Sequence, residues 1–145
     1  MSLDFGAKIP FVTHLGFTLE VFEGGTSELH YAPRPEHQNS FAVTHGGACM
    51  TFLDVIMATA ARSAQPEMGV VTIEMKTSFM RPAPAAPGGK LVGKGRLMHR
   101  TRSMAFTEGT IYDDQGRACA HATGTFKYVP RAAPGPSGVA TLPTD

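Results

Sequence analysis

Hydrophobic positions along this chain predict one helix and several strands. The segment from Gly46 to about Ala64 is the only one that favours a helix: Asp54 is its sole charged residue before Arg62, and Pro66 ends it. Because the segment lacks a polar side, we expect the helix to be covered on most sides by the rest of the protein.

Most of the remaining pattern predicts strands, because apolar and polar residues alternate along it. Two short strands flank Gly24-Gly25, whose glycines are a hairpin signal. The turn Asp113-Asp114-Gln115-Gly116 separates the last two long candidates. The predicted strands span residues 16–23, 27–31, 70–79, 90–102, 103–113 and 117–129, and proline-containing loops lie at 33–40 and 82–89.

One long helix combined with five or six antiparallel strands predicts an α+β domain in which the sheet wraps around the helix. A chain of 145 residues suits a single domain, which we place at residues 1–129. The tail at 130–145 is rich in proline and glycine, and we expect it to be disordered.

Composition excludes several classes of function. The net charge is +1, so no strong field attracts nucleic acid or a membrane surface, and no apolar run approaches the ~18 residues of a membrane span. The N-terminus lacks a signal-peptide pattern, so we expect a cytoplasmic protein. Cys49 and Cys119 match neither a disulfide framework nor a metal motif, and the histidines lack metal-ligand spacing. We therefore predict no metal and no cofactor, and interpret both cysteines as small core residues.

Asp54 and the start of the predicted helix are the candidates for catalytic chemistry. A carboxylate on an apolar helix is rarely buried unless it is paired or used. The preceding His45-Gly46-Gly47 leaves unobstructed backbone amides at the helix N-terminus, where the helix dipole favours a developing negative charge. Amides of this kind form the oxyanion hole that hydrolysis of a thioester or ester requires.

The spacing of these two groups argues against a site within one chain. Asp54 follows Gly46 by eight residues, which is about 12 Å along a helix that rises ~1.5 Å per residue, whereas both groups must lie within about 3 Å of one carbonyl group. Two antiparallel copies of the helix would bring the start of one close to the middle of the other. If the protein is a hydrolase, we therefore predict a two-fold homodimer with two shared active sites.

Each of these features also has a purely structural interpretation. Asp54 could be a buried acid bonded to backbone amides or hydroxyls. His45 could bond a neighbouring carbonyl group at the helix start, and Gly46-Gly47 could be a simple loop-to-helix turn. Taken one at a time, none of the three features decides between structure and catalysis.

Asn39, His45-Gly46-Gly47 and Asp54, followed by the segment Gly69–Pro82, resemble the hotdog-fold acyl-CoA thioesterases and, among them, the phenylacetate-pathway (PaaI-like) branch. The resemblance extends over residues 15–126. It implies a hotdog fold, in which an antiparallel sheet wraps one long central helix, and a homodimer with shared active sites that is often paired into a tetramer. It also implies that the activity is hydrolysis of acyl-CoA or aryl-CoA thioesters to the free acid and coenzyme A.

By position, the resemblance assigns a role to each residue of the candidate site. The Gly46 N–H would polarise the thioester carbonyl, and Asp54 of the partner subunit would act as the nucleophile or as the general base that activates water. Asn39 would orient the water or the carbonyl group, and His45 would hold the helix start and line the site. Thr72 occupies a position where related enzymes place a hydroxyl near the attacking water.

Contacts to coenzyme A are expected in several places. By alternation, Lys94, Arg96, Arg100 and Arg102 would share one strand face. This basic strip either binds phosphates or is a solvated outer face, the interpretation that we favour for Lys94 and Arg96. The resemblance favours coenzyme A contacts at Gly47 and at two segments. The candidates are His99, Arg100, Thr101, Arg102 and Ser103 in one segment and Phe79, Met80, Arg81 and Pro82 in the other.

Two other functions stay open from the sequence. A CoA-thioester binding module on the same fold would bind its ligand without turnover, and the presence of Asp54 argues against it. A hotdog hydratase or dehydratase is the second alternative. The sequence contains neither the His-Phe-Pro type loop typical of the dehydratases nor the His/Asp arrangement of the hydratases, which lowers that alternative.

Overall fold

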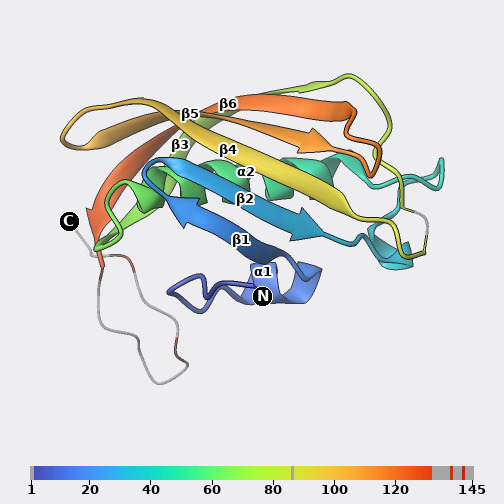
Figure 1. Ribbon diagram of the computed structural model, residues 1–145, viewed down its shortest axis with the longest axis horizontal. Helices are drawn as coiled ribbons and strands as arrows, with labels where there is room; N and C mark the ends of the chain where they lie inside the picture. The colour runs from blue at the N-terminus through green and yellow to red at the C-terminus, as the bar shows by residue number, and fades with distance from the viewer. Residues whose placement is uncertain (1, 86, 132–137, 139–141, 143–145) are drawn as a thin grey trace.

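A six-stranded antiparallel sheet curves around one long helix in the described part of the chain (Figure 1). This arrangement confirms the predicted α+β hotdog architecture. The computed structural model describes residues 2–85, 87–131, 138 and 142. Its elements are α1 (Pro10–Leu15), β1 (Thr18–Glu23), β2 (Thr26–Tyr31), a 3₁₀ turn (Pro35–His37), α2 (Gly46–Ser63), β3 (Met68–Phe79), β4 (Leu91–Arg100), β5 (Met104–Tyr112) and β6 (Ala118–Pro130).

The order of the strands places β3 at an edge of the sheet. The order is β1-β2-β4-β5-β6-β3, and every neighbouring pair is antiparallel. β3 is twelve residues long and pairs with β6 on one side. Within the described residues its other side has no strand partner, so a long row of backbone donors and acceptors remains open there.

α2 packs its apolar side into the concave side of the sheet, where Phe52 and Ile56 are fully buried. Two glycines of β4 allow this close approach. A Cβ at Gly93 would lie 2.1 Å from Ile56 Cδ1, and a Cβ at Gly95 would lie 2.7 Å from the Ile56 carbonyl oxygen. Any side chain at these two positions would push the helix away from the sheet and open voids in the core.

α1 is the element that the sequence pattern did not predict. It begins at Pro10, at a position where proline is favoured, and ends at Gly16, which has a left-handed conformation with φ of 81°. Its six residues form fewer than two turns, which is too short for hydrophobic periodicity to separate a helix from a loop.

The other predicted boundaries agree closely with the structure. α2 begins at Gly46 and ends at Ser63, and β6 continues to Pro130, one residue past the predicted end of the domain. The predicted disorder of the tail lies largely outside the described residues. Neither helix in the described part of the chain is long and apolar enough to cross a membrane.

The prediction of one basic strip along β4 is wrong for its second half. A bulge between Leu97 and His99 shifts the register with β5. Arg100 therefore pairs with the buried residue Ala105 and turns toward the helix, where its Nη1 donates to Gln65 Oε1 at 2.5 Å. Alternation along the sequence does not reveal a bulge, because one extra residue reverses the sides of all the residues that follow it.

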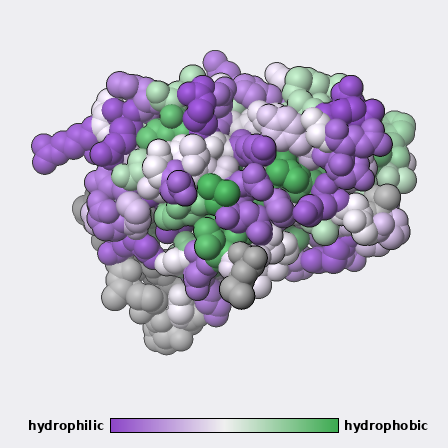
Figure 2. All heavy atoms as spheres, viewed as in Figure 1, coloured by the Kyte–Doolittle hydropathy of each residue, from purple (hydrophilic) through white to green (hydrophobic). Residues whose placement is uncertain are grey.

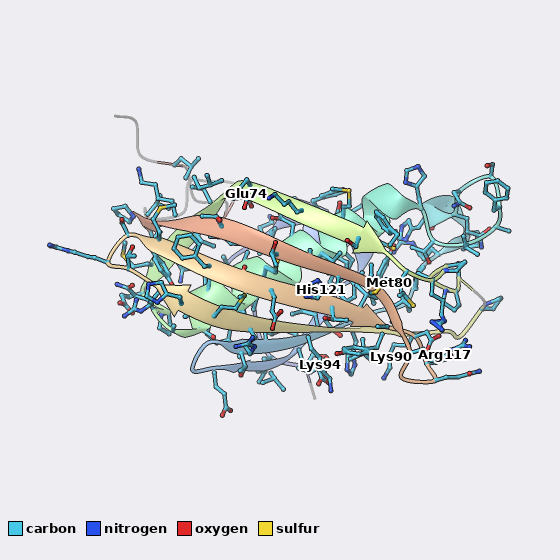
Figure 3. All side chains as sticks on the ribbon, turned by 90° about the horizontal axis from the view of Figure 1, so that it is seen from above. Glu74, Met80, Lys90, Lys94, Arg117 and His121 are labelled. Carbon is cyan, nitrogen blue, oxygen red and sulfur yellow. The ribbon has the colours of Figure 1, made fainter. Side chains whose placement is uncertain are left out.

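The outer face of the sheet is polar, which agrees with the solvated outer face that we favoured for Lys94 and Arg96 over a phosphate-binding strip. Figure 3 looks onto this face and shows Glu74 on β3, His121 on β6 and Lys94 on β4. Arg96 Nη2 lies 2.5 Å from Glu108 Oε1, and His121 Nε2 lies 3.2 Å from Glu108 Oε2. In the view of Figure 2, hydrophilic residues dominate the visible surface and hydrophobic ones form small patches. Exposed ion pairs contribute at most about 1 kcal/mol to stability, so these contacts add little to the fold and are typical of a solvated face.

Candidate functional site

At the start of α2, the N–H groups of Gly46 and Ala48 have no acceptor among the described residues. His45 is the N-cap residue, and its Nδ1 accepts a hydrogen bond from the Gly47 N–H at 2.8 Å. The His45 carbonyl oxygen accepts from the Cys49 N–H at 3.1 Å. Gly46 is the first residue of the helix, and among the described residues its N–H has no acceptor. Because the dipole of α2 adds partial positive charge there, this amide can stabilise an oxyanion.

The loop that leads into α2 is held by its own side chains. Asn39 Oδ1 accepts from the N–H groups of Phe41 and Val43 at 2.8 and 3.3 Å. The loop is then attached to the segment after β3, because the Thr44 N–H donates to the Ala83 carbonyl oxygen at 3.0 Å. The side-chain oxygen of Asn39 is therefore used within the loop, and its NH₂ group is the part that can face a ligand.

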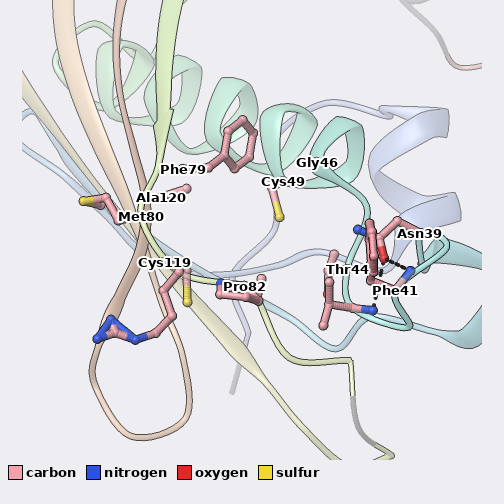
Figure 4. A pocket seen from close by; sticks show the side chains of 13 residues that line it. Asn39, Phe41, Thr44, Gly46, Cys49, Phe79, Met80, Pro82, Cys119 and Ala120 are labelled. Atoms are coloured by element: carbon pink, nitrogen blue, oxygen red, sulfur yellow. Dashed lines mark hydrogen bonds between the residues drawn. The ribbon is translucent and has the colours of Figure 1, made fainter.

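A cavity of about 480 Å³ opens beside Gly46. Its walls come from the loop before α2, the first turn of α2, the end of β3 and the beginning of β6 (Figure 4). Six of the residues predicted from the sequence line it, namely Asn39, Gly46, Phe79, Met80, Arg81 and Pro82. Most of the lining side chains are apolar, so the cavity suits an apolar group whose polar end meets the Gly46 amide.

The end of β3 places Phe79 against the start of the helix. A Cβ built on Gly46 would lie 3.5 Å from the Phe79 ring. The N–H groups of Met80 and Arg81 both donate to the Cys119 carbonyl oxygen, at 2.8 and 3.1 Å. These bonds fix the segment after β3 to β6, so the wall of the cavity is held by backbone contacts rather than by flexible side chains.

Asp54 lies two turns further along α2, half-buried beside β3. Thr72 Oγ1 donates to Asp54 Oδ1 at 2.7 Å. Burial raises the pKa of the Asp54 carboxyl, and the hydrogen bond from Thr72 opposes that shift. The register of β3 shifts between Thr72 and Glu74, and a bulge of this kind re-aims the side chains next to it. A carboxylate with a raised pKa is a stronger base than a solvated one.

Within one chain, the predicted site residues form separate groups. Asp54 and Thr72 are not part of the wall of the cavity that contains Gly46. The predicted coenzyme A contacts at residues 99–103 lie at the turn between β4 and β5, at the opposite end of α2 from Gly46 (Figure 1). The Gly47 N–H, another predicted contact, is occupied by His45.

Several residues of the cavity were not predicted from the sequence. Phe41, Cys49, Cys119 and Ala120 line it together with the predicted residues, and Figure 4 shows both cysteine side chains beside the cavity. Both cysteines are buried and free, as expected of core residues. No local signal marks Cys119 or Ala120, because only the pairing of β3 with β6 brings them to the helix start.

Known proteins resemble this chain in sequence. The family model described as the thioesterase superfamily matches residues 41–120. The proofreading thioesterase EntH of Klebsiella pneumoniae is 27% identical over 119 residues, which are 81% of this chain and 85% of that protein. The region matched by the family model contains Gly46, Asp54, Thr72 and the segment that ends β3.

Solved structures share the same architecture. A phenylacetic acid degradation-related protein of Ralstonia eutropha has a TM-score of 0.75 at 26% identity, over 83% of this chain and 92% of that chain. A protein of Streptococcus mutans, solved bound to acetyl-CoA, has a TM-score of 0.72 at 21% identity, over 79% of this chain and 89% of that chain. Both likenesses cover most of this chain and agree with the fold described above.

Proposed function

The chain belongs to the thioesterase superfamily, and we propose that it hydrolyses the thioester of an acyl- or aryl-coenzyme A to a carboxylic acid and free coenzyme A. The observation that carries this proposal is the Gly46 N–H, which lies beside a mainly apolar cavity and has no acceptor among the described residues. The Streptococcus mutans structure holds acetyl-CoA, which supports CoA thioesters as the class of substrate.

In the proposed reaction, the acyl group occupies the cavity and the thioester oxygen accepts the Gly46 N–H. Asp54 of the partner subunit takes a proton from a water molecule that attacks the carbonyl carbon, or attacks that carbon itself to form an anhydride that water then hydrolyses. In both routes the oxygen gains negative charge, which the amide and the dipole of α2 stabilise. The C–S bond breaks, and coenzyme A leaves as a thiolate that takes up a proton. The Asn39 NH₂ group would help orient the carbonyl group or the water.

The open edge of β3 supports the requirement for a second copy of the chain. Ile73 and Phe79 on this strand are each 53% exposed. A long edge strand with exposed apolar side chains is a template for another strand. Antiparallel pairing of β3 with its copy in a second chain would cover this edge and repeat each contact by two-fold symmetry.

Two contacts along β3 favour a shared site in such a dimer. Thr72 contacts Asp54, and Phe79 lies against the position of Gly46. In an antiparallel pair centred in the middle of the segment 72–79, Thr72 of one copy lies opposite Phe79 of the other. Asp54 of the partner subunit would then face the Gly46 amide, which resolves the separation of the two groups within one helix.

The same two-fold pairing supports the expected coenzyme A contacts. It would bring the turn at residues 99–103 of the second copy to the end of the molecule that carries Arg81. Arginine binds phosphate oxygens with two parallel hydrogen bonds, so Arg81 and Arg102 of the partner subunit are suited to the phosphates of coenzyme A. The pairing of two such dimers into a tetramer stays a prediction.

A panel of aliphatic and aryl CoA thioesters, followed with a thiol reagent, tests the proposed activity. We expect release of free coenzyme A, with apolar acyl groups preferred over charged ones because the cavity is mainly apolar. Background reaction of the thiol reagent with the protein should be small, because burial raises the pKa of the Cys49 thiol to about 11 and also raises that of Cys119.

Two other outcomes would indicate the rival functions. A thermal shift with coenzyme A but no thiol release would indicate a binding module. Loss or gain of a double bond without thiol release would indicate a hydratase or dehydratase.

Thr72→Val should move the acidic limb of the pH profile of kcat/KM to higher pH. Asp54 acts as a carboxylate in either route, so activity rises as that group loses its proton. Burial already raises its pKa, and the Thr72 hydroxyl opposes the shift; without the hydroxyl the pKa rises further, and more of the acid is protonated at a given pH. Thr125→Val is the matched control, because Thr125 donates to Glu74 on the outer face. An unchanged limb in Thr72→Val would show that Asp54 does not control the profile.

A further inference from the structure

A buried tyrosine–histidine pair lies directly behind the start of α2. Tyr31 and His37 are 1% and 7% exposed, respectively. The Tyr31 hydroxyl lies 2.7 Å from His37 Nδ1, and burial raises the pKa of that hydroxyl to about 12, so it stays protonated. Neither residue lines the cavity beside Gly46, and the proposed reaction gives neither of them a role.

The hydrogen bonds define the state of the His37 ring. The backbone N–H of Arg34 donates to His37 Nδ1 at 3.2 Å, so Nδ1 is an acceptor and the Tyr31 hydroxyl is a second donor to it. The ring is therefore neutral and carries its proton on Nε2. Burial lowers the pKa of His37, which favours the same neutral state.

His37 is connected by its backbone to the amide that the proposed reaction uses. Its carbonyl oxygen accepts from the His45 N–H at 2.8 Å. The residues that follow and precede this contact, Gln38 and Thr44, form an isolated antiparallel bridge. His45 in turn accepts the Gly47 N–H through Nδ1, and the neighbouring Gly46 N–H has no acceptor among the described residues. Tyr31, His37 and His45 thus form one continuous series of contacts that ends next to Gly46.

We propose that Tyr31 and His37 are positioning residues that hold the Gly46 amide in its orientation toward the thioester oxygen. This inference rests on the proposed function. The Tyr31 hydroxyl holds the His37 ring, the His37 carbonyl holds His45, and His45 removes the competing Gly47 amide. Displacement of an oxyanion donor by a fraction of an ångström weakens transition-state binding, because hydrogen bonds depend steeply on distance and angle.

A second observation supports a functional rather than a stabilising role. His37 Nε2 is buried and has no hydrogen-bond partner among the described residues. A buried N–H without a partner lowers stability, and here it belongs to the ring whose Nδ1 accepts from Tyr31 and Arg34. This cost is explained if the Nδ1 acceptor and the His37 backbone are needed to arrange the helix start.

Tyr31→Phe tests this role with the smallest possible change. The variant keeps the ring that packs against Phe17 and Phe52 at 4.8 and 5.3 Å between centroids. We expect kcat to fall about tenfold with KM little changed, because the lost contact acts on the transition state. Tyr128→Phe is the matched control, because the Tyr128 hydroxyl is also buried and donates to the Ala61 carbonyl oxygen at 2.6 Å, but at the far end of α2. Its kcat should stay within about twofold of wild type.

Two further measurements keep the inference separate from the proposed function. Backbone amide NMR should show shifted Gly46 and Gly47 signals in Tyr31→Phe and unshifted ones in Tyr128→Phe, whether or not any thioester is hydrolysed. His37→Asn, which can place an acceptor near Nδ1, should retain more kcat than His37→Leu. Equal kcat values in Tyr31→Phe and Tyr128→Phe, or unshifted glycine signals in Tyr31→Phe, would overturn the positioning role. Absence of thiol release by the wild-type protein would instead overturn the proposed function.

Discussion

Asp54→Asn is expected to lose about 10²–10⁴-fold in kcat while keeping the native fold, a range typical for removal of a positioned acid–base group. Asparagine has nearly the same shape as aspartate, and its side-chain oxygen can still accept the hydrogen bond from Thr72 that Asp54 accepts at 2.7 Å. It can neither take a proton from water at neutral pH nor attack a carbonyl carbon. Thiol release from the best CoA thioester, measured at saturating substrate, gives the change in kcat.

Thermal unfolding separates this loss of activity from a loss of structure. Burial raises the pKa of Asp54, so its contribution to the free energy of unfolding is fully present below its unfolded pKa and is lost as the pH rises through the folded pKa. A neutral asparagine avoids that loss, so the Tm of Asp54→Asn at neutral pH should equal or exceed that of the wild type. Glu74→Gln is the control: it removes an exposed carboxylate of β3 that contacts Thr125, and activity should remain. A fully active Asp54→Asn variant would refute the assigned mechanism.

Gly46→Pro is expected to reduce kcat by about 10²–10³-fold, the usual effect of removing one oxyanion-hole donor. Gly46 is the first residue of α2, where proline is well tolerated because the N–H it lacks has no partner within the helix. His45 has φ of −59° and ψ of 137°, an extended conformation of the kind that proline requires of the residue before it. The substitution therefore removes the proposed donor with little disturbance of the helix, which circular dichroism can verify.

Gly46→Ala controls for the added side chain. Its Cβ would lie 3.5 Å from the Phe79 ring, which is an ordinary van der Waals contact, and its N–H is retained. We expect most of the activity to remain in Gly46→Ala. If Gly46→Pro were as active as Gly46→Ala, the Gly46 amide would not be the oxyanion donor.

The two inactive variants together test whether the site is shared between subunits. Asp54→Asn and Gly46→Pro chains would be unfolded and refolded together as an equal mixture. Half of the resulting two-fold dimers would contain one chain of each kind, and in each of these one of the two sites would combine an intact Gly46 with an intact Asp54 of the partner subunit. The mixture should therefore recover about a quarter of wild-type activity. A site contained within one chain would recover nothing, since every chain in the mixture carries a defect.

Much of the fold could be predicted because its signals are local. The apolar run that begins after His45-Gly46-Gly47 and ends before Pro66 predicts α2 with almost the observed bounds. Long-range effects account for the errors. The bulge after Leu97 turns Arg100 toward Gln65, just beyond the end of α2, and the pairing with β5 that sets this register is not contained in any local pattern. α1 was missed because its stability comes from the burial of Val12 and Leu15 in the core.

The sequence by itself determined that Gly46 and Asp54 cannot act on one carbonyl group within a single helix, because helix rise is a local property of the backbone. It also identified Asn39, Thr72 and the end of β3 as candidates. Only the tertiary structure decided that Phe79 and Cys119 lie beside Gly46. It also decided that His45 accepts the Gly47 N–H, while the Gly46 N–H has no acceptor among the described residues. It also decided that Tyr31 and His37 lie behind them. These arrangements depend on strand order and on contacts between residues far apart in the chain, whose energies are settled only when the whole core packs.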